Sequence, residues 1–203
     1  MKYKGTALLT RTSKMPGKSI GIGAWRCKTG GKLAEIDGST CSKCYALKGA
    51  YAWSSYKRAE AKRWELINKP QEFKRIMIAG LNRLKKPEFR WFDSGDVQSE
   101  AMAHMILDIC EATPKLVHWI PSRELKIWRN VLKARKLPDN VTLRISAHMI
   151  DASPVKDFPN TSTVHKHNAP IGHICPAPKQ GGECGDCRAC WSRDVKNVSY
   201  HQH

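Results

Sequence analysis

The middle of the chain alternates between short runs of strand-forming residues and longer amphipathic segments. Four runs rich in β-branched, aliphatic and aromatic residues are predicted strands: residues 89–92, 115–120, 141–146 and 161–167. Two segments between them, residues 99–111 and 124–136, carry apolar residues at helical spacing. Strands that alternate with helices of this length predict βαβ units and a parallel sheet.

Two more apolar stripes precede these strands, and Pro70 separates them. One stripe contains Phe73, Ile76, Met77, Gly80, Leu81 and Leu84, and the other contains Trp53, Tyr56, Trp64 and Ile67. The glycine-rich segment 17–38 is predicted to be a loop with a strand near residues 19–25. We therefore expect an α/β fold: a partial (βα) barrel-like parallel sheet with helices outside and a cysteine-rich C-terminal tail.

Composition favours a single folded domain over residues 1–203. Residues 1–48 would be an N-terminal segment with a cysteine loop, residues 49–170 a helical region with the βα units, and residues 171–203 a metal-organised tail that cannot build a core alone. The chain has no run of eighteen apolar residues, and residues 1–6 lack the apolar run of a secretory signal. We expect no membrane partner and a cytoplasmic location, where eight cysteines are better explained as metal ligands than as disulfides.

Charge adds a candidate partner. Lysine and arginine number 35 against 18 acidic residues, which gives a formal charge of +17. Such an excess favours nucleic acid or another polyanion as a partner, and the alternative is a soluble protein from a proteome with a basic bias. Most of these charges would be solvated helix faces. Exposed tryptophans along a phosphate track are conceivable, but seven tryptophans are more simply explained as core residues.

The tail contains the strongest chemical signal. Its four cysteines have the spacing C-x8-C-x2-C-x2-C: Cys175, Cys184, Cys187 and Cys190. Structural zinc sites usually use two separate cysteine pairs, whereas three cysteines three residues apart with a distant fourth are closer to the ferredoxin pattern for a four-iron cluster. The tail therefore predicts a [4Fe–4S] site, with zinc and then a non-metal role as the alternatives.

A second group consists of Cys41 and Cys44, with Cys27 fourteen positions earlier. Three thiolates without an obvious fourth could hold a cluster with one open iron, a non-cysteine ligand could complete the site, or the pair could share a zinc ion with the tail. We favour the open cluster as the hypothesis. Cys110 lies on the apolar face of a predicted helix, so we assign it to the core.

Polar residues follow the predicted strands, where parallel α/β folds gather functional groups. We predict acid–base chemistry for Asp93 and Asp96. The candidates for binding a small-molecule cofactor are Ser94, Gly95, Ser122, Arg123 and His148. Further polar residues at strand ends are Ser146, His165 and His167. The alternative interpretation is local: residues 93–96 would only form a turn, and Ser99 would cap a helix.

Several of these motifs resemble a phage family, the gene product 88 domain family. The resemblance rests on four features: residues 14–19 (KMPGKS), the run Cys41-x-x-Cys44-Tyr45-Ala46, the turn of residues 91–96, and the terminal cysteine cluster. It covers most of the chain and implies a phage-encoded protein acting in the host cytoplasm. The family name implies no reaction.

The layout is also similar to that of radical S-adenosylmethionine enzymes. By this resemblance Cys27, Cys41 and Cys44 would hold a cluster with one open iron, an auxiliary cluster would lie near the C-terminus, and residues 93–96 would contact the amino group of S-adenosylmethionine. The chain departs from that family because the C-x3-C-x2-C loop is absent and four or five strands are recognisable instead of six. A non-radical relative is therefore an open alternative.

Three hypotheses about function result. The first is an iron–sulfur protein with two [4Fe–4S] clusters that acts as a radical-type or redox enzyme on an unknown small molecule. The second is a non-catalytic nucleic-acid-binding metalloprotein with iron–sulfur or zinc. The third is an electron-transfer module.

Overall fold

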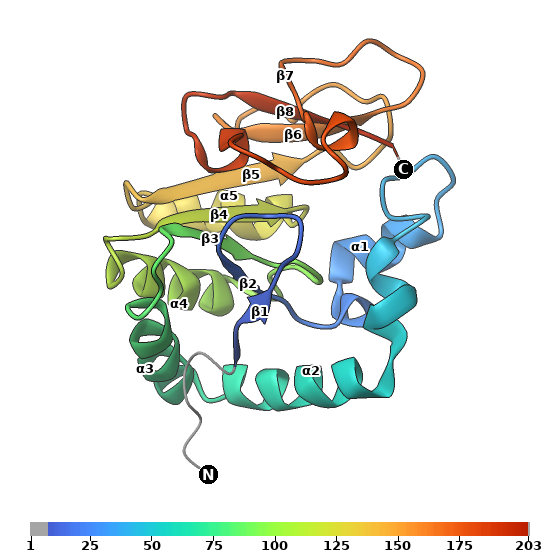
Figure 1. Ribbon diagram of the computed structural model, residues 1–203. Helices are drawn as coiled ribbons and strands as arrows, with labels where there is room; N and C mark the ends of the chain where they lie inside the picture. The colour runs from blue at the N-terminus through green and yellow to red at the C-terminus, as the bar shows by residue number, and fades with distance from the viewer. Residues whose placement is uncertain (1–7, 203) are drawn as a thin grey trace.

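The computed structural model describes residues 8–202, so residues 1–6, which the secretory-signal argument concerns, lie outside the described residues. Eight strands form one sheet in the order β1-β2-β3-β4-β5-β6-β8-β7 (Figure 1). The strands are β1 (Thr10–Arg11), β2 (Lys18–Ile20), β3 (Glu88–Trp91), β4 (Val117–Ser122), β5 (Val141–Ser146), β6 (Thr161–His165), β7 (His173–Ile174) and β8 (Asn197–His201). All neighbours are parallel except β1 and β2, which are antiparallel.

Five α-helices are described: α1 (Lys28–Ala34), α2 (Ser54–Ile67), α3 (Pro70–Leu81), α4 (Glu100–Glu111) and α5 (Leu125–Ala134). The predicted βαβ units are confirmed, because α4 connects β3 to β4 and α5 connects β4 to β5. Pro70 begins α3, where its missing N–H costs nothing, and the Ser99 hydroxyl accepts the Met102 N–H as a cap at the start of α4.

The α/β class with a mostly parallel sheet is confirmed, but closure into a barrel is not. The sheet is open, and β1 and β7 lie at its two edges. Within residues 8–202, no helix combines the length and the apolar character that crossing a membrane requires.

Strand alternation gives the sheet two different faces. On one face Phe89, Trp91 and Ile120 join the buried core with apolar residues of α3, α4 and α5. Cys110 is fully buried in this core, as the sequence predicts. The opposite face carries Arg90 and other polar or amphipathic side chains, and the C-terminal segment covers it.

The tail is not an appendage, which corrects the sequence-based expectation. It contributes β7 and β8 to the sheet, and β8 pairs along its whole length with β6. Trp191 is buried, its ring lies 5.2 Å from that of Trp119, and its indole N–H donates to the Phe89 carbonyl. The sequence prediction failed because both strands are short and are separated by a Gly- and Cys-rich loop.

Two other expectations about the N-terminal half were wrong. Trp53 does not belong to an inward stripe of α2, since its side chain is 65% exposed. Helix α1 was not predicted, because its glycines, Gly30 and Gly31, favour loops. Two of the seven tryptophans, Trp25 and Trp53, are exposed and not in the core.

Candidate metal centres

Strands β2 to β6 run in parallel, so they end on one side of the sheet, which we call its carboxyl end. The residues that follow these strands include most of the predicted site residues: the three N-terminal cysteines after β2, residues 93–96 after β3, Arg123 after β4 and His148 after β5. The topology thus brings together groups that are far apart in sequence.

Hydrogen bonds connect these groups into one network. Asp96 accepts from the Ser122 hydroxyl at 2.6 Å and from the backbone N–H of Arg123 at 2.7 Å. The Arg123 guanidinium donates to the hydroxyl of Thr40 at 2.9 Å, and the His148 ring bonds to the Arg123 carbonyl at 3.1 Å. Because Thr40 directly precedes Cys41, the network joins the acidic turn after β3 to the cysteine segment.

Cys27, Cys41 and Cys44 form what we call the three-thiol site. Burial, together with the charges of Asp96, Cys44 and Cys41, raises the pKa of Cys27 to about 12. Burial also raises the pKa of the Cys41 thiol, while the Arg123 guanidinium acts in the opposite direction. The three sulfurs are therefore within electrostatic reach of one another, and Cys27 and Cys41 are also within reach of Asp96.

Gly30 leaves space beside two of these sulfurs. A Cβ atom at residue 30 would lie 3.0 Å from the Cys27 Cβ and 3.6 Å from the sulfurs of both Cys27 and Cys41, whereas one at Gly31 would meet no atom of residues 8–202 within 4 Å. Cys27 directly precedes α1, and Gly30 follows about one helical turn later. Gly30 therefore lies on the same side of the helix as the Cys27 side chain. The local structure thus keeps a side-chain-free position between two thiols.

Asp93 and Asp96 are both buried but have different environments. Burial raises the pKa of Asp96 to about 6, although hydrogen bonds from Ser122 and from two backbone N–H groups oppose this shift. Asp93 accepts from the Ser19 hydroxyl at 2.7 Å through one oxygen, while its other oxygen has no partner among the described residues. Asp96 is the acid that adjoins the three-thiol site.

Ser94 and Gly95 are explained by the turn itself. Gly95 has φ +77°, and a Cβ atom there would lie 2.7 Å from the Ile22 carbonyl oxygen. The Ser94 hydroxyl donates to the same carbonyl and also bonds to the Tyr56 hydroxyl. These two residues dock the turn after β3 onto the chain after β2, so the local interpretation accounts for their identity.

Three other polar residues at strand ends form hydrogen bonds between strands or between the loops that follow them. The Ser146 hydroxyl bonds to Ser162, and the His165 ring bonds to the Ser199 hydroxyl. The backbone N–H of His167 donates to the Asp151 carboxylate. Within residues 8–202, none of these hydrogen bonds reaches the three-thiol site.

Cys175, Cys184, Cys187 and Cys190 form the tail site. Burial raises the pKa of Cys175, and Cys187 raises it further. Burial also raises the pKa of Cys184, with additional contributions from Cys175 and Cys187. Burial raises the pKa of Cys190 to about 11, although its hydrogen bond to Tyr200 opposes the shift. The four thiols of the predicted motif are thus electrostatically coupled to one another, with Cys175 acting on both Cys184 and Cys190.

Arg144, a residue that the sequence analysis missed, holds the tail site in place. It is fully buried in β5 and donates to five backbone carbonyls, of Thr161, Ala189, Cys190, Ser192 and Val195. Four of these carbonyls belong to the segment that contains or follows Cys190. An arginine between apolar strand residues (Leu143 and Ile145) was the signal that would have revealed it.

Arg90 is the second missed residue, and it lies between the two cysteine groups. Its guanidinium stacks 4.6 Å from the Trp119 ring and contacts the Tyr45 hydroxyl at 3.5 Å, next to Cys44. The same charge lowers the pKa of Cys184 and Cys190 against the effect of their burial. Arg90 therefore provides positive charge near the thiols of the tail site and contacts the residue that follows Cys44.

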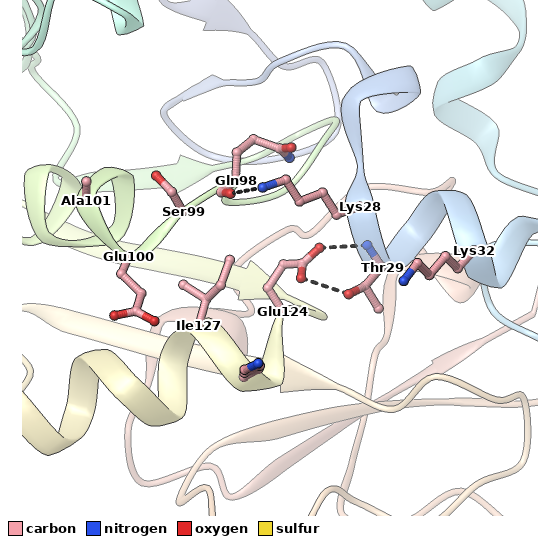
Figure 2. Close-up of a pocket in the computed structure, with 10 residues that line it drawn as sticks. Lys28, Thr29, Lys32, Gln98, Ser99, Glu100, Ala101, Glu124 and Ile127 are labelled. Atoms are coloured by element: carbon pink, nitrogen blue, oxygen red, sulfur yellow. Dashed lines mark hydrogen bonds between the residues drawn. The ribbon is translucent and has the colours of Figure 1, made fainter.

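An open groove of about 620 Å³ begins at the residue after Cys27 (Figure 2). Lys28 donates to the Gln98 carbonyl at 2.7 Å, and the Glu124 carboxylate accepts from the N–H and the hydroxyl of Thr29 at 2.9 and 2.7 Å. These bonds fasten α1 to the starts of α4 and α5. The groove is lined by residues of α1 and by residues at the starts of α4 and α5, and Cys27, Cys41 and Cys44 are not among its described lining residues.

Among residues 8–202, no three His, Cys, Asp or Glu side chains are arranged to hold a single metal ion. Comparison with known proteins gives one family: a sequence model of the family described as Gene product 88 matches residues 2–193. No curated protein and no solved structure matches the chain. The family match confirms the phage-family resemblance of the cysteine and turn motifs, while the radical S-adenosylmethionine resemblance stays a hypothesis.

Proposed function

The chain belongs to the gene product 88 family, a description that names no reaction, and we propose from its own side chains that it is an iron–sulfur protein with two [4Fe–4S] clusters. The observation that carries the proposal is the division of seven cysteines into two groups whose members shift one another's pKa. The eighth, Cys110, is isolated in the core.

The chemistry of the thiols supports clusters over a single ion. A zinc ion draws each sulfur to about 2.3 Å, whereas a cubane binds its thiolates through separate iron atoms and therefore accepts more widely spaced ligands. Gly30 leaves room beside Cys27 and Cys41, and Arg90 supplies positive charge near the tail thiols. Both features favour a bulky, negatively charged group.

We assign the reactive role to the three-thiol site, because three thiolates leave one iron of a cubane open to an exogenous ligand. Asp96 is buried beside Cys27, and its pKa of about 6 would allow it to hold or release a proton near neutral pH. Arg123, fixed by Thr40, would position an anionic group of the ligand. S-adenosylmethionine is the ligand to test first, and the groove of Figure 2 is the proposed entrance.

Anaerobic reconstitution followed by iron and sulfide analysis and electron paramagnetic resonance tests the two-cluster proposal. We expect about eight irons and eight sulfides per chain. Cys41→Ala and Cys184→Ala should each retain about half of this content. Cys110→Ala is the matched control, since it removes a thiol outside both groups and should leave the content unchanged.

Two results would contradict the proposal. One is stoichiometric zinc without iron in protein prepared without oxygen, and the other is equal iron loss in all three variants. Addition of S-adenosylmethionine to the reduced protein then separates an enzyme from an electron-transfer module. A changed resonance spectrum and its loss in Cys41→Ala support a ligand at the open iron, whereas reversible reduction without any effect of the ligand favours electron transfer.

A further inference from the structure

We propose that residues 43–58, with Trp25 beside them, form a binding surface for single-stranded nucleic acid. We call this stretch the aromatic–basic segment. It comprises the 3-10 helices at Tyr45–Leu47 and Gly49–Ala52 and the start of α2. The inference is independent of the proposed clusters, because it rests on exposed rings and charges and uses no thiol.

The composition of the segment differs from that of the rest of the chain. It contains four basic residues, four aromatic residues and no Asp or Glu. The basic residues, all exposed, are Lys43, Lys48, Lys57 and Arg58. None of them forms an ion pair with another residue in the described range 8–202. Their charges are therefore free to meet phosphates.

The aromatic rings form a continuous row. Trp25 contacts Tyr56 at 6.3 Å between ring centroids, Tyr56 contacts Tyr51 at 4.9 Å, and Tyr51 contacts Tyr45 at 5.8 Å. The two ends of the row, Trp25 and Tyr45, are 45% and 58% exposed, and Trp53 is 65% exposed. A soluble protein gains nothing by leaving such rings in water, but each of them can stack on an unpaired base.

The row of aromatic rings lies next to the three-thiol site. The row begins two residues before Cys27 and ends at the residue after Cys44, so it flanks the three-thiol site. The Tyr45 hydroxyl donates to the Asp93 carbonyl at 2.6 Å, which fixes this end of the row to the carboxyl end of the sheet. A strand bound along the rings would pass beside that end.

Single strands fit this surface better than duplexes do. Rings can stack only on bases that are unpaired, and stacking tolerates any sequence. The overall formal charge of +17 adds attraction for any polynucleotide, so salt dependence alone would not identify the surface. The test must therefore distinguish the contribution of the aromatic rings to binding from that of the basic side chains.

Fluorescence anisotropy with labelled thymidine and uridine oligonucleotides of about 20 nucleotides provides the test. If four phosphates are contacted, affinity should fall roughly 50-fold between 50 and 200 mM salt. Trp53→Ala should weaken binding about tenfold, and Trp53→Phe, which keeps a ring, should restore most of it. Tighter binding of either the thymidine or the uridine oligonucleotide supports the proposal and shows whether the surface prefers DNA or RNA.

A charge-matched pair of variants completes the design. Lys48→Ala with Lys57→Ala should make the salt dependence shallower by about 1.4 in logarithmic slope. Lys85→Ala with Lys86→Ala removes the same charge from two exposed residues before β3, on the opposite side of the sheet, and should change it little. Equal effects of both pairs would overturn the proposal, as would a duplex that binds as tightly as the single strand with Trp53→Ala without effect.

Discussion

Arg144 is a single side chain on which the C-terminal segment depends. Its guanidinium pairs with no carboxylate in the described part of the chain and instead donates to five carbonyls. Replacement by methionine would leave these buried acceptors without a donor, which costs about 1–3 kcal/mol for each unsatisfied group that water cannot reach. We expect Arg144→Met to lower the free energy of unfolding by about 3 kcal/mol or more.

The same variant should release the tail cluster selectively. Iron content should fall to about half, as expected for Cys184→Ala, because the chain around Cys190 loses its anchor. Urea unfolding and iron analysis measure the two effects, and Arg83→Met at an exposed position is the control. Full iron content in a folded Arg144→Met protein would show that the tail thiols are positioned without the guanidinium.

His118 gives the protein a pH-dependent stability. Burial lowers the pKa of its imidazole to about 4, below the value of 6.5 in an unfolded chain. Between these two values the unfolded state binds the extra proton, so stability is present above pH 6.5 and is lost as pH falls toward 4. This residue should lower the free energy of unfolding by about 2 kcal/mol from pH 7 to pH 5.

His118→Gln tests this contribution, since glutamine can still bond to the Thr113 hydroxyl, which contacts the His118 ring at 2.9 Å. The raised pKa of Asp96 gives the opposite pH dependence of stability in part of the same range. Asp96 is present in both the unmodified protein and the His118→Gln variant, so its contribution cancels in the comparison. Urea unfolding at pH 7 and pH 5 should therefore show a smaller loss in the variant. An identical loss would mean that His118 does not titrate in this range.

At the scale of elements, periodicity predicted the regular part of the fold well. Residues 141–146 are a strand as expected, and α4 and α5 lie within a few residues of their predicted bounds. The failures share a physical cause: α1, β7 and β8 are short, and tertiary contacts outweigh local preference there. Pro121 is an example, because it lies within β4 although a proline there suggests the end of a strand.

Helix α1 offers a matched pair of glycines for testing the three-thiol site. Alanine has a higher helix propensity than glycine, so Gly31→Ala should favour the helix by up to about 1 kcal/mol, whereas in Gly30→Ala the new methyl group would lie 3.0 Å from the Cys27 Cβ and offset this gain. Only the methyl group at residue 30 would lie beside Cys27 and Cys41. We expect Gly30→Ala to lower iron incorporation at this site while Gly31→Ala leaves it intact.

Iron analysis of both variants in a Cys184→Ala background measures the three-thiol site alone. A thermal melt of each variant checks that the helix is retained. Equal iron content in the two variants would indicate that the space above Gly30 is not used by a cluster.

At the scale of the whole molecule, the sequence predicted which residues meet but not what holds them together. The strand ends pointed to Asp96 and Arg123, which hydrogen bonds join to Thr40, while the assignment of the two cysteine groups to metal sites stays a prediction. The sequence marks Arg144 as unusual, because it lies between apolar strand residues, but it could not reveal the partners of Arg90 or Arg144, which include residues 45 and 46 positions away in the chain. Long-range contacts of this kind follow from strand order, which no local pattern contains.

The integrated tail leads to a prediction about truncation. If residues 171–203 were a metal-held appendage, removing them would leave a folded protein with one cluster. The structure instead places β8 against β6 and Trp191 against Trp119, so truncation would expose the polar face of the sheet and leave the Trp119 ring and the edge of β6 uncovered. We expect a chain of residues 1–170 to lose cooperative unfolding and to aggregate, since an uncovered strand edge and apolar surface promote association.

A full-length variant distinguishes loss of the tail thiols from loss of β7 and β8. In this variant alanine replaces Cys175, Cys184, Cys187 and Cys190. It lacks the tail thiols but keeps β8, Trp191 and the carbonyls that bind Arg144, so it should unfold cooperatively in urea and retain about half of the iron. The truncated chain should do neither. Cooperative unfolding of residues 1–170 would contradict this argument, because the sheet would then be stable without its last two strands.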